Sequence, residues 1–251
     1  SGTTGQPKAC MHFHRDVLAM ADVVGRHLLQ TRPEDVYAGS PPLGFTFGLG
    51  ALLVFPLRFR AASVPIEAPT PPNILAAIER HRVTCLFTAP FAYRALSAEL
   101  AGRDLSSLKR CVSAGEFLPK SVSDTWFEKT GIRLIDGIGA TEMIHIFISA
   151  AGSAIRPGAT GKPLPGYQAC VLDDDGKPLP PGSTGRLAVT GPTGCRYLDD
   201  PRQRDYVQGG WNVTGDLYRV DEDGYFWLLG RADEVRCRLR AARRRSRGPG
   251  P

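Results

Sequence analysis

Apolar residues in the first half of the chain follow two spacings, one typical of helices and one typical of buried strands. In residues 15–30, Val17, Met20, Val24 and Leu28 recur at three- or four-residue intervals and would share one helix face. This spacing predicts helices over residues 15–30, 71–82, 90–100 and 119–129. Short apolar runs predict strands over residues 9–13, 36–39, 62–66, 83–88, 109–113 and 132–135.

The alternation of strands and helices predicts an α/β fold with a doubly wound, mostly parallel sheet. Residues 41–50 are rich in Gly, Pro and Phe and are expected to begin as a loop before the apolar residues 52–57. Ligands of such sheets bind at the carboxyl ends of the strands. Two polar segments, residues 113–116 and 136–142, lie at predicted strand ends, so we expect a binding site there.

The second half of the chain has a different composition, because Pro and Gly become frequent after about residue 149. Strands are expected over residues 167–172, 185–189, 216–220 and 225–229. The last two would form a hairpin around the turn at residues 221–224. The predicted organisation is an α/β part (1–150), a β-rich lobe of the same domain (151–234) and a disordered tail (235–251).

The charge of the chain is concentrated in that tail, which contains seven Arg and no acidic residue. The net charge is +6, but the remaining residues carry 24 basic and 25 acidic side chains. The body is therefore close to neutral and does not resemble a nucleic-acid-binding surface. The tail composition cannot build a core, and we expect it to be mobile and solvated.

The six cysteines are scattered and lack the close spacing of a metal site or redox motif. We interpret all of them as small buried apolar residues, which fits a reducing cytoplasm. They are Cys10, Cys85, Cys111, Cys170, Cys195 and Cys237.

No apolar run is long enough to span a bilayer, and no leader is evident. Because the chain starts inside a motif and without Met, we expect a fragment that lacks its N-terminal portion.

The first eight residues, Ser-Gly-Thr-Thr-Gly-Gln-Pro-Lys, combine glycines, hydroxyls and a cation. Glycine lets the backbone approach a ligand closely, and hydroxyls with backbone N–H groups form a concave anion site. Lys8 adds a mobile charge suited to a polyphosphate. The segment predicts a phosphate-binding loop, although it lacks the Gly-Lys-Ser/Thr of the common nucleotide loop. A flexible hydroxyl-rich loop is the alternative.

Two histidines follow this segment. Because His12 and His14 alternate on a predicted strand, they would face one side and could ligate a metal. No third ligand is evident, so a structural or surface role is favoured.

Six short motifs occur in a characteristic order. They are residues 1–8, 43–48 (Leu-Gly-Phe-Thr-Phe-Gly), 113–116 (Ser-Ala-Gly-Glu), 139–142 (Gly-Ala-Thr-Glu), 214–216 (Thr-Gly-Asp) and 230–233 (Gly-Arg-Ala-Asp). Together they resemble the acyl-adenylate-forming superfamily of AMP-binding ligases, over residues 1–234. Residues 136–147, Asp-Gly-Ile-Gly-Ala-Thr-Glu-Met-Ile-His-Ile-Phe, look like those of benzoate- and aminobenzoate-CoA ligases.

The resemblance implies a reaction in two halves with ATP, Mg²⁺ and coenzyme A. A carboxylic acid attacks the α-phosphate of ATP to give acyl-AMP and pyrophosphate, and the CoA thiol then displaces AMP. The first half needs charge neutralisation and positioning more than a covalent nucleophile. The expected partners are small molecules, without nucleic acid or membrane. The sequence leaves the oligomeric state and the ring substituents of the acid open.

By the same resemblance, the nucleotide would be held by residues from several motifs. The phosphates would be bound by Ser1, Thr3, Thr4, Lys8 and Thr141, the adenine by Gly115, Glu116 and Asp136, and the ribose by Asp216 and Arg231. Glu142 would bind Mg²⁺, a hard cation that takes oxygen ligands and few from the protein. Lys8, Thr141 and Glu142 would form the catalytic set, and Asp233 would be the hinge of a rotating C-terminal domain.

The matching acyl-pocket positions supply an aromatic wall and small residues that leave room for a ring. They are Thr46, Phe47, Ala114, Gly139, His145 and Ile146. Each assignment has a structural alternative. Phe47 could belong to the core, Asp216 could cap a turn, and Arg231 could pair with Asp233. A Thr-Glu pair is also a common helix start.

The chain departs from the family pattern in two places. Ile138 replaces the aromatic residue that stacks on adenine in many members, as it often does in aryl-CoA ligases. After Glu234 the Arg-rich tail stands where the family continues into a C-terminal domain with a catalytic lysine. We interpret the tail as a frame shift or truncation, and expect the 251 residues alone to be inactive in the complete reaction.

Three other functions stay open from the sequence. One is a non-catalytic remnant of such a ligase. The second is an RNA-binding protein that acts through the Arg tail. The third is an amino-acid-activating adenylation domain, which usually carries the aromatic residue missing at position 138.

Overall fold

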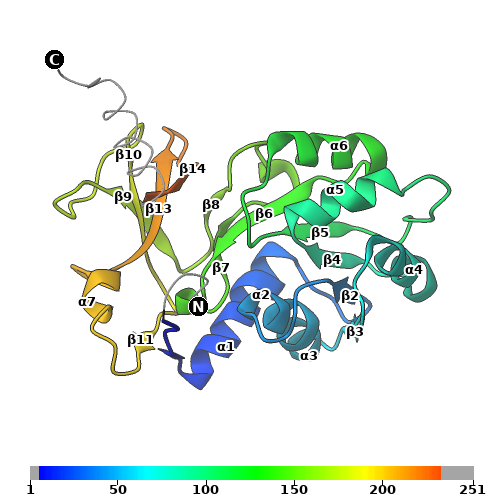
Figure 1. The fold of residues 1–251 in the computed structure, drawn as a ribbon, viewed down its shortest axis with the longest axis horizontal. Helices are drawn as coiled ribbons and strands as arrows, with labels where there is room; N and C mark the ends of the chain where they lie inside the picture. The colour runs from blue at the N-terminus through cyan, green and yellow to red at the C-terminus, as the bar shows by residue number, and fades with distance from the viewer. Residues whose placement is uncertain (1–5, 233–251) are drawn as a thin grey trace, which may run out of the picture.

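The computed structural model describes residues 6–232. The predicted phosphate ligands Ser1, Thr3 and Thr4, the predicted hinge Asp233 and the Arg-rich tail lie outside the described residues. The described part forms an α/β lobe, at the right of Figure 1, and a smaller β lobe at its left.

The α/β lobe is built on a seven-stranded sheet of order β3-β2-β4-β5-β6-β7-β8. Neighbours from β3 to β6 run parallel, and β7 and β8 are antiparallel additions at one edge. The strands are β3 (Ala62–Val64), β2 (Val36–Gly39), β4 (Cys85–Thr88), β5 (Arg110–Ser113), β6 (Leu134–Gly139), β7 (Ile146–Ser149) and β8 (Lys162–Pro163). The predicted mostly parallel sheet is confirmed.

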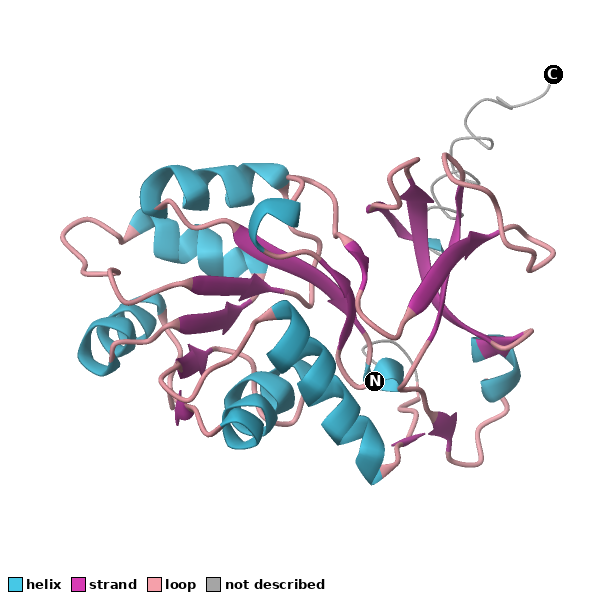
Figure 2. Ribbon diagram, turned by 180° about the vertical axis from the view of Figure 1, so that it is seen from behind, coloured by secondary structure: helices cyan, strands magenta, loops and turns pink. Residues whose placement is uncertain are grey.

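Helices cover both faces of this sheet (Figures 1 and 2). On one face lie α1 (His14–Met20), its π-helical continuation η1 (Ala21–Leu28), and a continuous helical segment made of α2 (Thr46–Leu49), η2 (Gly50–Val54) and α3 (Phe55–Phe59). On the other lie α4 (Pro71–His81), α5 (Pro90–Ala98) and α6 (Lys120–Thr130). Successive residues of a strand point to opposite faces of the sheet, so Phe87 packs with the first set of helices and Leu86 with the second. The predicted double winding is therefore confirmed.

Two predicted elements differ from the structure. The expected loop at 41–50 ends early, because helix begins at Thr46 and buries Ala51 and Phe55 against the sheet. The expected strand at 9–13 shrinks to β1 (Cys10–Met11), because His14 already starts α1.

The β lobe is a five-stranded antiparallel sheet. Its strands are β12 (Val207–Gln208), β13 (Trp211–Val220), β10 (Thr184–Thr190), β9 (Gln168–Leu172) and β14 (Phe226–Arg231). The predicted hairpin is confirmed as β13 and β14, whose turn is closed by a Gly224 N–H bond to the Asp221 carbonyl. Below this sheet in Figure 1, β11 (Arg196–Tyr197) pairs with β1 and is followed by α7 (Gln203–Tyr206).

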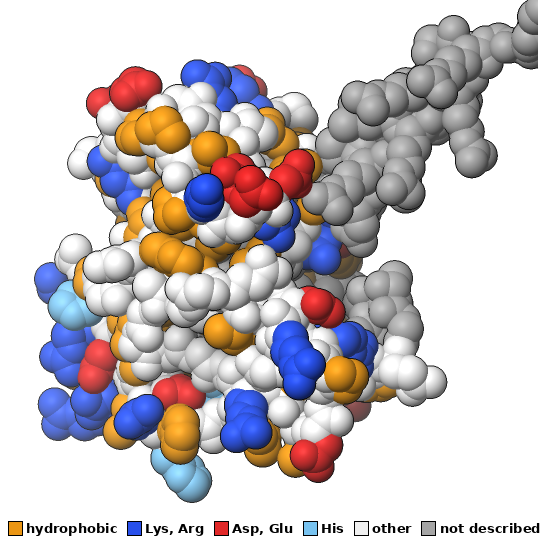
Figure 3. Space-filling model, turned by 90° about the vertical axis from the view of Figure 1, so that its left-hand side faces the viewer, with side chains coloured by type: hydrophobic (Ala, Val, Ile, Leu, Met, Phe, Trp, Pro, Cys, Tyr) orange, Lys and Arg blue, Asp and Glu red, His pale blue; other side chains and the backbone are white. Residues whose placement is uncertain are grey.

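The two lobes share one hydrophobic core, which includes Phe147 of β7, Tyr167, and Leu187 of β10. Strand β8, from the part predicted to begin at residue 151, completes the α/β sheet. The division at residue 150 stays a prediction. Figure 3 shows acidic and basic side chains interspersed on one face of the molecule, as expected for a body whose charges nearly cancel.

Candidate active site

A pocket of about 690 Å³ lies between the two lobes. Its walls come from the loop after β5, the end of β6, and strands β13 and β14. Among the residues predicted to form the site, it is lined by Lys8, Gly115, Glu116, Asp136, Gly139, Glu142, Asp216 and Arg231. Residues that are far apart in the sequence thus meet in one cleft, at the carboxyl ends of β5 and β6.

The carboxyl ends of β5 and β6 form one wall of this cleft. Ser113 pairs with Asp136 across the parallel strands, so both strands end at the same level. The chain leaves β5 through Gly115, whose φ of +91° is in the left-handed region that favours glycine. Glu116 follows at the cleft rim with an exposed side chain.

Glu142 is the buried carboxylate of the cleft, and two groups hold it. The Tyr197 hydroxyl donates to its Oε1 over 2.7 Å, and the Lys8 ammonium lies 3.3 Å from the same oxygen. Lys8 Nζ also donates to the Tyr197 hydroxyl oxygen over 3.0 Å. Burial alone would raise the pKa of Glu142, but the Tyr197 hydroxyl, a backbone hydrogen bond and the Lys8 charge together outweigh it and lower the pKa. The carboxylate is therefore held ionised at neutral pH.

Tyr197 is a site residue that the sequence analysis missed. It is 3% exposed, its ring lies 4.7 Å from Lys8 Nζ, and the Tyr206 ring of α7 packs on it at 5.4 Å. A lone tyrosine in a Gly-rich loop carries no local signal of such a contact. Only the pairing of β1 with β11 brings it beside Lys8.

Thr141 begins a 3₁₀ turn, η3 (Thr141–Met143), that projects Glu142 into the cleft. His12 Nε2 lies 2.7 Å from the Thr141 carbonyl oxygen, and its Nδ1 lies 3.3 Å from Asp16 Oδ2. Asp16 is itself buried and accepts the Phe13 N–H over 3.0 Å. His12 therefore fixes the start of the turn that carries Glu142.

This geometry decides between the roles considered for the two histidines. The expectation that His12 and His14 face one side of a strand was wrong, because the strand ends at Met11 and His14 is exposed at the start of α1. Within residues 6–232, no three His, Cys, Asp or Glu side chains cluster as a metal site. The favoured structural role of His12 fits the hydrogen bonds that it makes.

Asp216 and Arg231 also line the cleft, on the neighbouring strands β13 and β14. They are register partners, and Arg231 Nη1 donates to Asp216 Oδ1 over 3.0 Å and to the Thr214 carbonyl over 3.3 Å. Gly215 has φ +82°, and a Cβ there would lie 3.0 Å from Arg231 Nη2. The Thr-Gly-Asp sequence thus lets the guanidinium lie close to the backbone beside the carboxylate.

The residues predicted for the acyl pocket surround His145. Its ring lies 5.9 Å from the Phe47 ring and 4.9 Å, edge-on, from the Phe55 ring. A Cβ on Gly50 would lie 2.5 Å from the His145 ring, and one on Gly139 would lie 2.9 Å from the His145 backbone. These two glycines make room for the buried histidine.

Three further predicted acyl-pocket positions lie in the α/β lobe. Ile146 pairs with Gly139 across β6 and β7, and Ala114 is buried in the same core. Thr46 is half-buried and begins α2. Phe47 is also half-buried and packs at 5.4 Å on Phe87, so the structure leaves both a core role and a wall role available to it.

Comparison with known proteins places these features in a family. Residues 1–196, most of the chain, match the family model of AMP-binding enzymes. The chain belongs to the AMP-binding enzyme family. This AMP-binding enzyme is 36% identical to a benzoate–CoA ligase of Thauera aromatica over 244 residues, covering 94% of this chain and 46% of that protein. It is also 36% identical to a 3-hydroxybenzoate–CoA ligase of Aromatoleum sp. (strain CIB) over 241 residues, covering 94% of this chain and 46% of that protein.

Solved structures agree with the fold of this AMP-binding enzyme. The anthranilate CoA ligase AuaEII in complex with anthranoyl-AMP matches with a TM-score of 0.88 and 42% identity, over 93% of this chain and 46% of that one. A benzoate CoA ligase from Burkholderia xenovorans LB400 matches with a TM-score of 0.83 and 31% identity. The match covers 93% of this chain and 51% of that one. The predicted superfamily and its aryl-CoA ligase likeness are confirmed. The chain spans about half the length of the curated relatives it matches.

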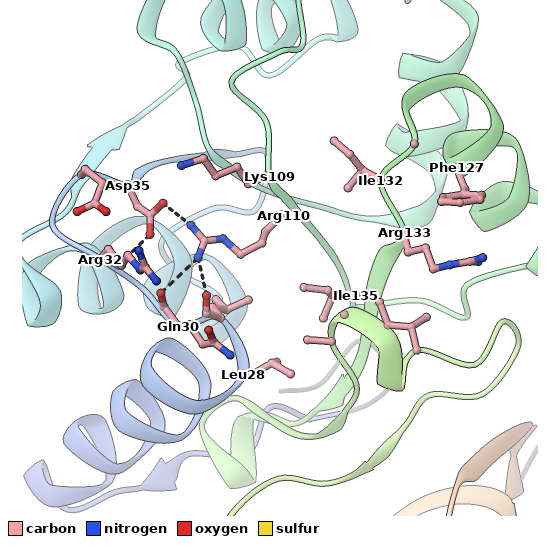
Figure 4. Close-up of a pocket in the computed structure, with 16 residues that line it drawn as sticks. Leu28, Gln30, Arg32, Asp35, Lys109, Arg110, Phe127, Ile132, Arg133 and Ile135 are labelled. Carbon is pink, nitrogen blue, oxygen red and sulfur yellow. Dashed lines mark hydrogen bonds and ion pairs between the residues drawn. The ribbon is translucent and has the colours of Figure 1, made fainter.

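Two further observations concern membrane segments and a second pocket of this AMP-binding enzyme. In the part of the chain that the structure describes, no helix is both long and apolar enough to cross a membrane. A second pocket, of about 660 Å³, lies at the amino ends of β5 and β6, and none of the predicted site residues lines it (Figure 4).

Burial of Asp136 in the cleft wall should make the stability of the fold depend on pH. Burial in the cleft wall raises the pKa of its carboxyl from 3.8 to about 7, against a smaller opposing effect of the Gly137 N–H. The folded state therefore binds a proton that the unfolded state releases between pH 3.8 and about 7. The free energy of unfolding should fall through that window as the pH rises, by up to about 4 kcal/mol.

We expect Asp136→Asn to remove this dependence. The variant should match the melting temperature of the parent at about pH 3.5, below this window, and exceed it at about pH 8, because the amide cannot ionise. Thermal melts at both pH values test this, with Asp175→Asn, an exposed turn residue, as control. An equal change at both pH values would show that burial of the charge is not the cause.

Proposed function

We propose that this chain binds MgATP and an aryl carboxylic acid and forms part of an AMP-forming aryl acid–CoA ligase. The observation that carries the proposal is the cleft lined by both the Lys8–Glu142 pair, which Tyr197 supports, and the Asp216–Arg231 pair. Its volume of about 690 Å³ suits a nucleotide-sized ligand. The relatives named as benzoate–CoA and 3-hydroxybenzoate–CoA ligases support the acid–CoA ligase assignment.

The two pairs of residues in the cleft suit the phosphate and ribose parts of ATP. Lys8 supplies a cation for phosphate oxygens, and its present partner, Glu142, is the carboxylate we assign to Mg²⁺. Magnesium is commonly held by one or two carboxylates plus substrate phosphates, which fits the ionised carboxylate of Glu142. When bound, the ion would neutralise phosphate charge. Asp216 can accept the hydrogen bonds of ribose hydroxyls, and Arg231 orients its carboxylate.

The aryl acid would lie beside Phe47 and His145, next to Gly139, which ends β6 and lines the nucleotide cleft. Burial lowers the pKa of His145 to about 4, so its ring is neutral at physiological pH and adds no charge to the acyl site. An aromatic wall with a neutral edge favours a flat ring over a charged amino acid. The structure titled as a complex with anthranoyl-AMP is consistent with a ring of this class. Coenzyme A would be the second acceptor, as in the acid–CoA ligase relatives.

A panel of non-hydrolysable acyl-sulfamoyl adenosines tests the aryl assignment directly on the 251-residue chain. We expect the benzoyl and 2-aminobenzoyl compounds to bind about tenfold more tightly than the dodecanoyl and alanyl compounds in calorimetry, or about 1.4 kcal/mol. AMP serves as the common reference for the nucleotide half. Phe47→Leu should weaken only the aryl compounds.

The panel also distinguishes the alternatives. Preference for the alanyl compound would favour an amino-acid-activating domain, and preference for the dodecanoyl compound would reject the aryl pocket. Pyrophosphate exchange with the same acids provides a catalytic readout.

A further inference from the structure

Two cysteines meet on the small ribbon that β1 and β11 form beside the cleft. Cys10 pairs in register with Tyr197, and Cys195 immediately precedes β11, two residues before Tyr197, so it lies diagonally across the ribbon from Cys10. Both cysteines are free thiols. The pair was not expected, because its members are 185 positions apart in the sequence and neither belongs to a short-spaced motif.

These two thiols differ from the cysteines buried in the sheet. Cys10 and Cys195 are partly exposed, whereas Cys85 and Cys111 are completely buried in β4 and β5. Burial raises the pKa of the Cys85 thiol to about 12, which makes it inert. The interpretation as small buried apolar residues therefore holds for Cys85 and Cys111 and is wrong for the partly exposed Cys10, Cys170 and Cys195. Cys237 lies outside the described residues.

The surroundings of Cys10 also favour reaction. The hydrogen bond from the Cys195 thiol lowers the pKa of the Cys10 thiol, and the Lys8 ammonium acts in the same direction. Burial and the Glu142 charge act against it, but the net direction is downward. A thiol with a neighbouring resolving thiol and access to solvent is the usual arrangement of redox-sensitive cysteines.

We propose that Cys10 and Cys195 form a reversible dithiol–disulfide site that responds to peroxide. The Cys10 thiolate attacks one peroxide oxygen, the O–O bond breaks, and Cys10 becomes a sulfenic acid while hydroxide leaves and takes a proton to form water. The Cys195 thiol then attacks that sulfur, the S–S bond forms, and the S–O bond breaks to release a second water. The two sulfurs together lose two electrons, which reduce one peroxide to two waters; a small dithiol returns the pair to thiols.

The disulfide would act on the cleft through the ribbon. Diagonal residues in an antiparallel pair lie about 7–8 Å apart, whereas disulfide-linked Cα atoms usually lie within about 4.4–6.8 Å. Closure must therefore draw the two strands together, and Gly194 before Cys195 gives the backbone freedom to follow. The same ribbon carries Tyr197 and leads directly to Lys8, which both hold Glu142. Resting on the proposed function, the oxidised form should bind MgATP less tightly.

The primary test is chemical and does not depend on nucleotide binding. The purified 251-residue chain is treated with a small excess of hydrogen peroxide, remaining thiols are alkylated, and the peptides are mapped by mass spectrometry without reduction. We expect a Cys10–Cys195 linked peptide, a mass loss of about 2 Da relative to the reduced chain, and full reversal by dithiothreitol. Cys10→Ser and Cys195→Ser should each abolish the link, whereas Cys170→Ser, a lone partly exposed cysteine on β9, should leave it intact.

The outcomes separate the two proposals. Oxidation of Cys10 and Cys195 to sulfinic acids without a link, or links only between chains, would overturn the site. A mapped intramolecular link with MgATP binding lowered about tenfold, restored by reduction, supports the whole inference. A link that leaves MgATP affinity unchanged would keep the dithiol site and overturn its effect on the cleft. Absence of MgATP binding in the reduced chain would count against the proposed function alone.

Discussion

Replacement of Glu142 by Gln is expected to abolish the Mg²⁺-dependent part of ATP binding. Glu142 is the buried carboxylate in the cleft, held by Lys8 at 3.3 Å and Tyr197 at 2.7 Å. The amide keeps the size of the side chain but loses the charge that a divalent cation requires. We expect about a 100-fold loss of affinity for MgATP, or about 2.7 kcal/mol. Calorimetry with ATP in the presence and absence of Mg²⁺ measures it.

Two further variants make the assignment specific. Lys8→Ala should cost only about tenfold, within the range of one charge-assisted hydrogen bond, and it should weaken ATP with and without Mg²⁺ alike. Glu142→Gln should leave metal-free ATP binding unchanged or tighter, because Lys8 is then released for the phosphates. Glu128→Gln, on the exposed face of α6, is the matched control. Equal, negligible losses in both cleft variants would show that neither residue has the proposed role.

Replacement of Asp35 by Asn is expected to destabilise the α/β lobe by about 3 kcal/mol, because it leaves the Arg110 guanidinium without its buried counter-charge. Asp35 is 2% exposed and accepts hydrogen bonds from Thr84 Oγ1 and the Arg32 N–H, each over 2.8 Å. It also pairs with Arg110, which in turn donates to the Leu29 and Gln30 carbonyls at the end of η1 (Figure 4). The melting temperature should fall by roughly 6–12 °C.

A double variant separates charge loss from general disruption. Asp35→Asn combined with Arg110→Met removes both charges and should recover at least half of the lost stability. Glu34→Gln, an exposed neighbour in the same loop, should have little effect. This cluster lies at the amino ends of the strands, away from the cleft. MgATP affinity of Asp35→Asn at low temperature should therefore equal that of the parent, and a parallel loss of affinity would contradict the separation.

The order of elements was readable from the sequence because local patterns determine it. Helical spacing predicts α4 within a residue, and the Asp-Gly turn at residues 221–224 predicts the β13–β14 hairpin. The helix from Thr46 was not predicted, because its Gly, Pro and Phe content favours a loop and only burial of Phe55 against the sheet overrides that preference. The motif order also sufficed to identify the family.

The contacts inside the site could not be read in this way. Tyr197 lies 189 positions from Lys8 and 55 from Glu142, and His12 lies 129 positions from Thr141. No local periodicity encodes such pairs, because they depend on where β11 docks and on how the turn at Thr141 leaves β6.

Hydrophobic spacing and short motifs were thus sufficient to predict the alternation of helices and strands, the parallel sheet and the family. Tertiary structure alone decided which groups share the cleft, which histidine supports it and which two cysteines meet. The physical reason is that hydrogen bonds and thiol contacts act over a few ångströms. Only the docking of β1 on β11 and of the β lobe on the sheet brings those distant residues within that range.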